Sequence, residues 1–147
     1  MMCLVGLVGT SCATTSTPPG DVPSEGVAAS GSGAALPAIT LRRTGGIAGV
    51  SDTVTVDPGG AWTVTDKAGR RRTGRLTADQ IAQVRALAVD PRLAAEARRS
   101  PGPSRCQDAF QYAVTAGATT VTYVDCPSDE RPPAAEALVA ALRTAAR

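Results

Sequence analysis

The sequence predicts an α+β domain in which four to five antiparallel strands form one sheet, two to three helices cover one face, and one disulfide closes the fold. Three observations support this class. Short segments that alternate between apolar and polar residues indicate strands in both halves of the domain. Apolar residues at helical spacing follow each group of strands. Only two cysteines lie in the part of the chain that is able to fold.

The first half of the domain reads as a meander of three strands. Residues 38–43, 53–56 and 61–65 each alternate or are rich in β-branched and aromatic side chains. Between the second and third of them lies Asp57-Pro58-Gly59-Gly60, a composition typical of tight turns.

Helices are expected after this meander and at the end of the chain. Thr77 and Gln80 have the spacing of a capping box, so a helix should begin there. Asp90-Pro91 interrupts that helix, and a short helical turn over residues 92–98 continues the chain. Pro132-Pro133 is expected to open the last helix, because proline is tolerated in a first helical turn.

The second half contains a hairpin whose register stays open. If residues 115–117 form a three-residue loop, Cys106 lies directly opposite Cys126; if the turn is Ala116-Gly117, Phe110 faces Tyr123. A β-bulge between the aromatic residues and the cysteines would reconcile the two registers. Alternatively, the second cysteine lies past the end of the ladder.

Residues 1–11 read as a leader that directs export. The apolar run at residues 1–9 is too short for a membrane span, which needs about 20 helical residues. Thr10-Ser11-Cys12 resembles the lipobox of bacterial lipoproteins, where the chain is cleaved and the new N-terminal cysteine is acylated. Cys12 is therefore the candidate lipidation site and the only expected membrane contact. An ordinary secretory leader is the alternative, and either one predicts an extracytoplasmic protein, lipid-anchored or secreted.

Residues 12–36 are rich in Ser, Thr, Gly and Pro and predict a disordered tether, which leaves residues 37–147 as the folded domain. Of the four cysteines, Cys3 and Cys12 belong to the leader and its cleavage point. Cys106 and Cys126 remain, and export makes a structural disulfide between them the expected pairing.

Composition argues against catalysis and against nucleic-acid binding. The chain has no histidine, which removes the usual general base and the commonest zinc ligand. No nucleophile and base, no metal-ligand cluster and no cofactor or small-molecule substrate site is visible in the sequence. The domain has 15 basic against 11 acidic residues and only four aromatic side chains, too few for a base-stacking surface.

Three further segments are candidate sites. The basic run Lys67 to Arg75 is able to dock an acidic partner, but a solvated loop or edge strand is the more ordinary interpretation. Asp108 and Asp125 flank the hairpin without a pocket or a third polar partner that would support acid-base chemistry. The glycines between residues 43 and 50 lack the order and the Lys-Ser/Thr ending of a phosphate-binding loop.

The run Ile39-Thr40-Leu41-Arg42-Arg43-Thr44-Gly45-Gly46-Ile47-Ala48-Gly49-Val50, followed by Asp108-Ala109-Phe110-Gln111-Tyr112, resembles the emfourin family. Emfourins are small bacterial inhibitors of protealysin-type, thermolysin-like metallopeptidases, and the resemblance spans residues 37–146. It implies that this domain occludes the cleft of such a zinc peptidase without any catalytic group of its own. An envelope-tethered protein-binding module without inhibitory activity is the alternative.

The inhibitory surface is expected on the glycine-containing loop between the first two strands. Ile47 at its centre is the candidate plug for an apolar specificity pocket, because glycines let the backbone approach a partner closely. The alternative is that Ile47 and Val50 fold back into the core. The candidate contact residues are Arg43, Thr44, Gly45, Gly46, Ile47, Ala48, Gly49 and Val50.

Overall fold

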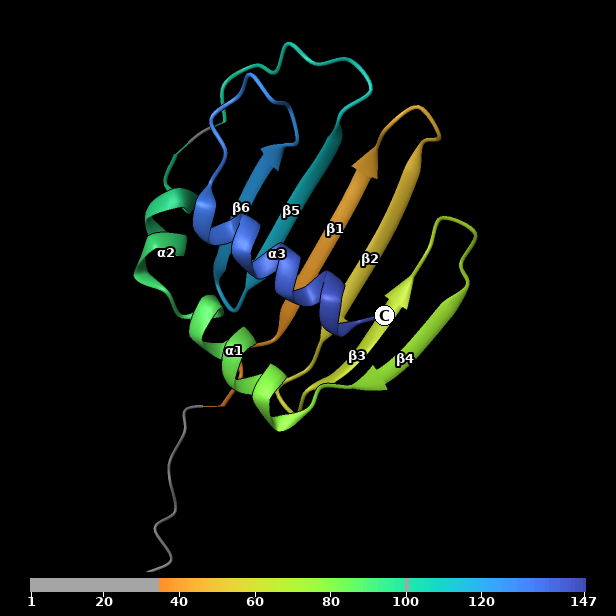
Figure 1. Ribbon diagram of the computed structural model, residues 1–147, viewed down its shortest axis with the longest axis vertical. Coiled ribbons are helices and arrows are strands. Elements are labelled where there is room, and N and C mark those ends of the chain that lie inside the picture. Colours follow the sequence, from red (N-terminus) through yellow and green to blue (C-terminus); the bar gives the residue numbers. More distant parts are fainter. Residues whose placement is uncertain (1–34, 100) are drawn as a thin grey trace, which may run out of the picture. The chain divides into compact units, whose positions relative to one another are not determined.

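The computed structural model describes residues 35–99 and 101–147, which form one antiparallel six-stranded sheet with three helices on one face (Figure 1). The predicted leader, Cys12 and residues 12–34 of the predicted tether lie outside the described residues. The α+β class and the placement of the helices on one face are confirmed. The elements, in chain order, are β1 (Ile39–Gly45), β2 (Val50–Val56), β3 (Ala61–Thr65), β4 (Arg71–Arg75), α1 (Ala78–Ala88), α2 (Pro91–Ala97), β5 (Phe110–Ala116), β6 (Thr119–Val124) and α3 (Pro133–Ala145).

The sheet has the strand order β4-β3-β2-β1-β5-β6, so β1 lies in its interior. The sixth strand, β4, exceeds the four to five predicted. Its sequence, Arg-Arg-Thr-Gly-Arg, is poor in residues that favour strands, but its pairing with β3 depends on the main chain. Gly74 leaves room for the ring of Trp62, because a Cβ on Gly74 would lie 2.4 Å from it. The arginines of β4 protect this sheet edge from pairing with other chains.

The β5–β6 hairpin turns one residue later than expected, and both predicted registers are wrong. Gly117-Ala118 forms the turn, and Tyr112 lies opposite Tyr123. Two-residue hairpin turns favour a glycine with positive φ at their first position, and Gly117 has φ +58° there. The two tyrosine rings stack with centroids 5.1 Å apart. A three-residue loop would have turned the buried Val121 outward, because a slip of one residue exchanges the faces of a strand.

The helices begin where their capping residues predict. The Thr77 hydroxyl accepts a hydrogen bond from the Gln80 main-chain N–H at 3.3 Å, and the Gln80 side chain accepts one from the Thr77 N–H at 2.8 Å. Asp90 caps α2, and Pro133 opens α3. The apolar faces of the helices pack on the inner face of the sheet. Leu36, placed in the tether by composition, is buried in this core.

The outer face of the sheet carries no helix (Figure 1), and most of the strand residues that point to it are polar. Antiparallel sheets tolerate water on one face, and threonine suits this position because it is β-branched and carries a hydroxyl. The hydroxyls of Thr115 and Thr120 lie 3.0 Å apart. Cross-strand pairing aligns one threonine from each strand into a continuous row: Thr73, Thr63, Thr55, Thr40, Thr115 and Thr120.

A buried carboxylate, that of Glu96 in α2, caps the N-terminus of α3. Its two oxygens accept hydrogen bonds from the main-chain N–H groups of Ala134 at 2.8 Å and Ala135 at 2.9 Å. The residue preceding α3, Pro132, supplies no side-chain cap. Glu96 is only 6% exposed, so a residue of one helix satisfies the free donors and the positive dipole end of another inside the protein.

The predicted disulfide between Cys106 and Cys126 is confirmed, with the two Cα atoms 5.8 Å apart. Neither cysteine belongs to the β5–β6 ladder, which is continuous and contains no bulge between Gln111 and Val124. Cys126 lies past the end of β6, as one alternative held. The strand expected from Cys106 begins only at Phe110, because Asp108 has a left-handed backbone conformation with φ +57°.

Replacing Glu96 with alanine is expected to lower the free energy of unfolding by about 3 kcal/mol, because two buried N–H groups lose their acceptor. The measurement is urea denaturation followed by circular dichroism. Glu130→Ala is the matched control: that carboxylate is exposed and contacts Arg99 at 3.5 Å, so its loss should cost less than about 0.5 kcal/mol. Equal effects of the two substitutions would contradict the capping role of Glu96.

Reduction of the Cys106–Cys126 bridge is expected to destabilise the domain by about 3 kcal/mol, because the bridge closes a loop with a sequence separation of 20 residues. The melting temperature should fall by roughly 10 °C, measured by calorimetry with and without reductant. Peptide mapping of the exported protein should recover the two cysteines as one linked pair. Recovery on separate, unlinked peptides would contradict the bridge.

Candidate functional site

The connection between β1 and β2 is a four-residue loop, Gly46 to Gly49, at one end of the sheet (Figure 1). The sequence predicted a longer loop over residues 44–50. Instead Thr44 and Gly45 belong to β1, Val50 begins β2, and Gly45 pairs directly with Val50. The strands extend further because their main-chain pairing continues through residues with low strand propensity. Both ends of the loop are therefore fixed by the sheet.

Two glycines allow the start of β5 to pack against this loop. Gly45 and Gly46 have φ values of +96° and +70°, which favour glycine. A Cβ on Gly45 would lie 2.5 Å from the Ala109 carbonyl oxygen, and a Cβ on Gly46 would lie 2.6 Å from the Phe110 ring. The glycines thus shape the loop and its contact with β5, as well as leaving its tip narrow.

Ile47 projects into solvent at the tip of the loop with 92% of its surface exposed. This excludes the alternative that it folds back into the core, whereas Val50 is partly buried. Among the described residues, the other exposed large apolar side chain is Val89, at 62%, after α1. A large apolar side chain that is exposed to solvent on a rigid loop is typical of interaction sites.

Three contacts hold the loop and its base in place. The Arg43 guanidinium donates a hydrogen bond to the Asp52 carboxylate at 2.7 Å across the β1–β2 pair. The same guanidinium lies 4.8 Å from the centroid of the Phe110 ring. Lys67, from the β3–β4 turn, donates a hydrogen bond to the Ala48 carbonyl at 2.6 Å. Arg43, one of the predicted contact residues, therefore also supports the loop from within the fold.

Sequence reasoning missed the roles of Asp52 and Lys67. An opposite charge facing Arg43 across a hairpin is detectable in principle from cross-strand pairing, but only when the turn is placed correctly. The contact of Lys67 with Ala48 joins two separate hairpins, and no local pattern predicts it.

The basic run from Lys67 to Arg75 does not form one continuous surface. It forms the turn before β4 and β4 itself, where successive side chains alternate between the two faces of the sheet. The Arg70 side chain pairs with Asp66, and its hydrogen bond lowers the pKa of that carboxyl. Arg72 lies on the helix side, opposite Val64, while its neighbours in β4 face outward.

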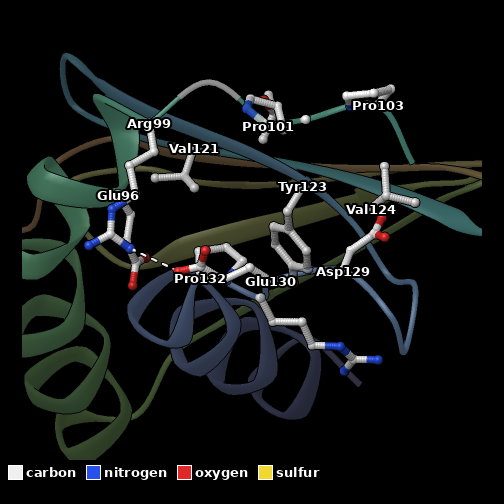
Figure 2. A pocket seen from close by; sticks show the side chains of 13 residues that line it. Glu96, Arg99, Pro101, Pro103, Val121, Tyr123, Val124, Asp129, Glu130 and Pro132 are labelled. Carbon is white, nitrogen blue, oxygen red and sulfur yellow. Dashed lines mark hydrogen bonds and ion pairs between the residues drawn. The ribbon is translucent and has the colours of Figure 1, made fainter. Parts of the chain in front are cut away.

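A separate pocket of about 290 Å³ lies beside β6, between the α2–β5 connection and the segment before α3 (Figure 2). Figure 2 shows Pro101 and Pro103 on one side, and Glu130 and Pro132 on the other. Burial raises the pKa of the Tyr123 phenol at its floor. The pocket combines a partly apolar lining with exposed ion pairs.

The three carboxylates that line this pocket have different partners: Glu130 pairs with Arg99, Asp129 accepts a hydrogen bond from the Ser128 hydroxyl, and Glu96 caps α3. Arg131 contacts both Asp125 and Glu136, and Arg99 contacts Glu130 at 3.5 Å. Asp108 and Asp125 share no hydrogen bond in the part of the chain that the structure describes, and Asp125 is paired with Arg131.

Within residues 35–99 and 101–147, no three His, Cys, Asp or Glu side chains lie close enough together to hold a metal ion. The described helices also include none with the length and apolar character needed to span a bilayer. The disulfide is of a kind found mainly in proteins outside the cytoplasm.

No family model matches this chain, and no curated protein shows significant similarity to it. The resemblance to emfourins therefore remains a prediction that depends on the residues quoted above. The β1–β2 loop with Ile47 at its tip is the candidate functional site.

Proposed function

We propose that this domain inhibits a thermolysin-like zinc metallopeptidase of the protealysin type by inserting the β1–β2 loop into its active-site cleft. The observation that carries the proposal is the exposure of Ile47 at the tip of a four-residue loop fixed at both ends by strand pairing. The emfourin-like sequence run includes this same loop. Thermolysin-like enzymes accept large apolar side chains in their main specificity pocket, which suits isoleucine.

The local structure favours tight binding because the loop is ordered before it meets a partner. Its base is held by the Arg43–Asp52 ion pair, and its side by the hydrogen bond from Lys67 to Ala48. A preorganised loop loses little conformational entropy on binding, so more of its contact energy contributes to affinity. The glycines on either side of the tip keep it narrow, which helps it to enter a cleft.

Ile47→Asp is expected to weaken inhibition of a protealysin-type peptidase by at least about 30-fold, because a carboxylate is poorly accepted by an apolar pocket. The inhibition constant is measured with a chromogenic peptide substrate. The free energy of unfolding should change by less than about 0.5 kcal/mol, because the side chain packs against nothing in the free protein.

Val89→Asp is the matched control, since it makes the same chemical change at the other exposed apolar residue. It should leave inhibition unchanged. A folded Ile47→Asp protein that inhibits as strongly as the original would move the inhibitory surface elsewhere. Binding to an envelope protein without inhibition of any such peptidase would favour the alternative function, a tethered binding module.

We also propose that the mature protein is a lipoprotein acylated at Cys12, which would place the inhibitor on the outer side of a cell membrane. The lipobox-like sequence Thr10-Ser11-Cys12 supports the proposal, and the Cys106–Cys126 disulfide is consistent with export.

Cys12→Ser is expected to release the protein from membranes, because a serine at the cleavage point accepts no thioether-linked lipid. The full-length protein should partition into the detergent phase of a Triton X-114 separation, and the variant into the aqueous phase. Cys3→Ser, a cysteine within the leader, is the control and should not change the partition. Membrane association that survives Cys12→Ser would argue against acylation at this residue.

A further inference from the structure

We propose that a second pocket, on the helix face of the sheet beside the C-terminal end of α3, binds a carboxylate carried on a short aliphatic chain. We name it the arginine pocket. Its volume is about 150 Å³. Apolar side chains from β1, β2 and β3 line it, and Arg43, which is paired with Asp52, lies at its edge. The other lining guanidinium groups come from β4, from α3 and from the residue that ends the described chain: Arg72, Arg143 and Arg147.

The pocket exists because α3 ends before it covers the far strands. Figure 1 shows α3 crossing the sheet from the β6 side and ending, near the C label, over the region of β2 and β3. Val64, on the inner face of β3, is therefore only partly buried. Arg72 lies opposite Val64 on β4 and shares its face of the sheet. An apolar floor and a charged rim consequently meet at this end of the helix layer.

Three positive charges on this rim have no acidic partner. Arg72, Arg143 and Arg147 form no ion pair with any carboxylate of residues 35–99 and 101–147. The one acidic side chain in the lining, Asp52, is paired with Arg43 at 2.7 Å. All three side chains are exposed, so their guanidinium groups are free to turn toward a carboxylate that enters the pocket.

The chemistry of the lining selects the kind of anion. Guanidinium groups match the planar geometry of a carboxylate and bind it through paired hydrogen bonds. Arg143 is positioned by the phenol of Tyr112, 3.4 Å from its Nη1. Inorganic phosphate would pair with the guanidinium groups, but it would leave the apolar side chains at the floor of the pocket exposed to water. A short alkyl chain would cover Val64 and its neighbours, so the lining favours an aliphatic carboxylate over a purely polar anion.

The test titrates sodium pentanoate into the full-length isotope-labelled protein and follows its NMR spectrum. Saturable shifts are expected at Val64, Arg72 and Arg143. Arg72→Gln should weaken binding about tenfold by removing one charge-assisted contact. Arg71→Gln is the matched control, because it removes the same charge from the adjacent β4 residue on the outer face and should leave the affinity unchanged.

Two further probes test separately the guanidinium groups and the apolar floor of the pocket. Pentanol lacks the charge, and acetate lacks the chain, so both should bind more weakly than pentanoate. No saturation with pentanoate up to about 20 mM, or equal losses in Arg71→Gln and Arg72→Gln, would overturn the proposal. Inhibition of a peptidase plays no part in this readout, so the result stands apart from the proposed function.

A second pair of probes distinguishes a protein side chain from a free acid as the source of the carboxylate. N-acetyl-glutamate amide presents the carboxylate as a partner protein would, and N-acetyl-glutamine amide is its uncharged control. Stronger binding of the glutamate compound than of pentanoate assigns the pocket to an acidic residue of a protein partner. The reverse order assigns it to a free aliphatic acid, and binding of neither class overturns the proposal.

Discussion

The buried carboxylate of Glu96 determines how the helix layer is assembled. By capping α3 from α2, it fixes where the long helix begins above β6, and the length of α3 then fixes where it ends. The side chains between the sheet and the three helices form the core. The inner face of β3 and β4 beyond the end of α3 remains partly open, and the arginine pocket lies there.

The candidate inhibitory loop owes its rigidity to its place in the sheet. It joins β1 and β2, and β1 is paired along its whole length on both sides, with β2 and with β5. A loop on an edge hairpin would be held from one side only. Here the start of β5 packs against the glycines, and the disulfide ties the segment before β5 to the segment after β6.

Arginine side chains have different roles in β1 and in β4. Arg43 forms an ion pair with Asp52 and lies over the Phe110 ring, so it supports the loop. Arg71 and Arg75 lie on the outer face of an edge strand, where they discourage pairing with other chains. Arg72, between them in sequence, faces the opposite side and reaches the arginine pocket. Strand alternation therefore divides one basic run into separate functions.

The sequence by itself determined the features that depend on local chemistry. The capping box at Thr77, the helix start at Pro133, the strand periodicities and the pairing of the last two cysteines all follow from residue type and spacing. The caps and periodicities are signals that extend over a few residues. The cysteine pairing follows because Cys3 and Cys12 belong to the leader and its cleavage point, which leaves one possible pair. The sequence does not decide whether Ile47 is exposed or packs into the core, because a glycine-rich turn is compatible with both.

The tertiary structure alone decided the remaining features, because they depend on residues far apart in the chain. The strand β4 exists through main-chain pairing with β3, despite side chains that do not favour it. The register of the last hairpin follows from the one position where a glycine satisfies a positive φ, together with burial of the tyrosines. The cap on α3 comes from Glu96 in another helix, and the arginine pocket combines β-strands with the end of α3. No sequence window contains both partners of such contacts, so only packing of the whole domain brings them together.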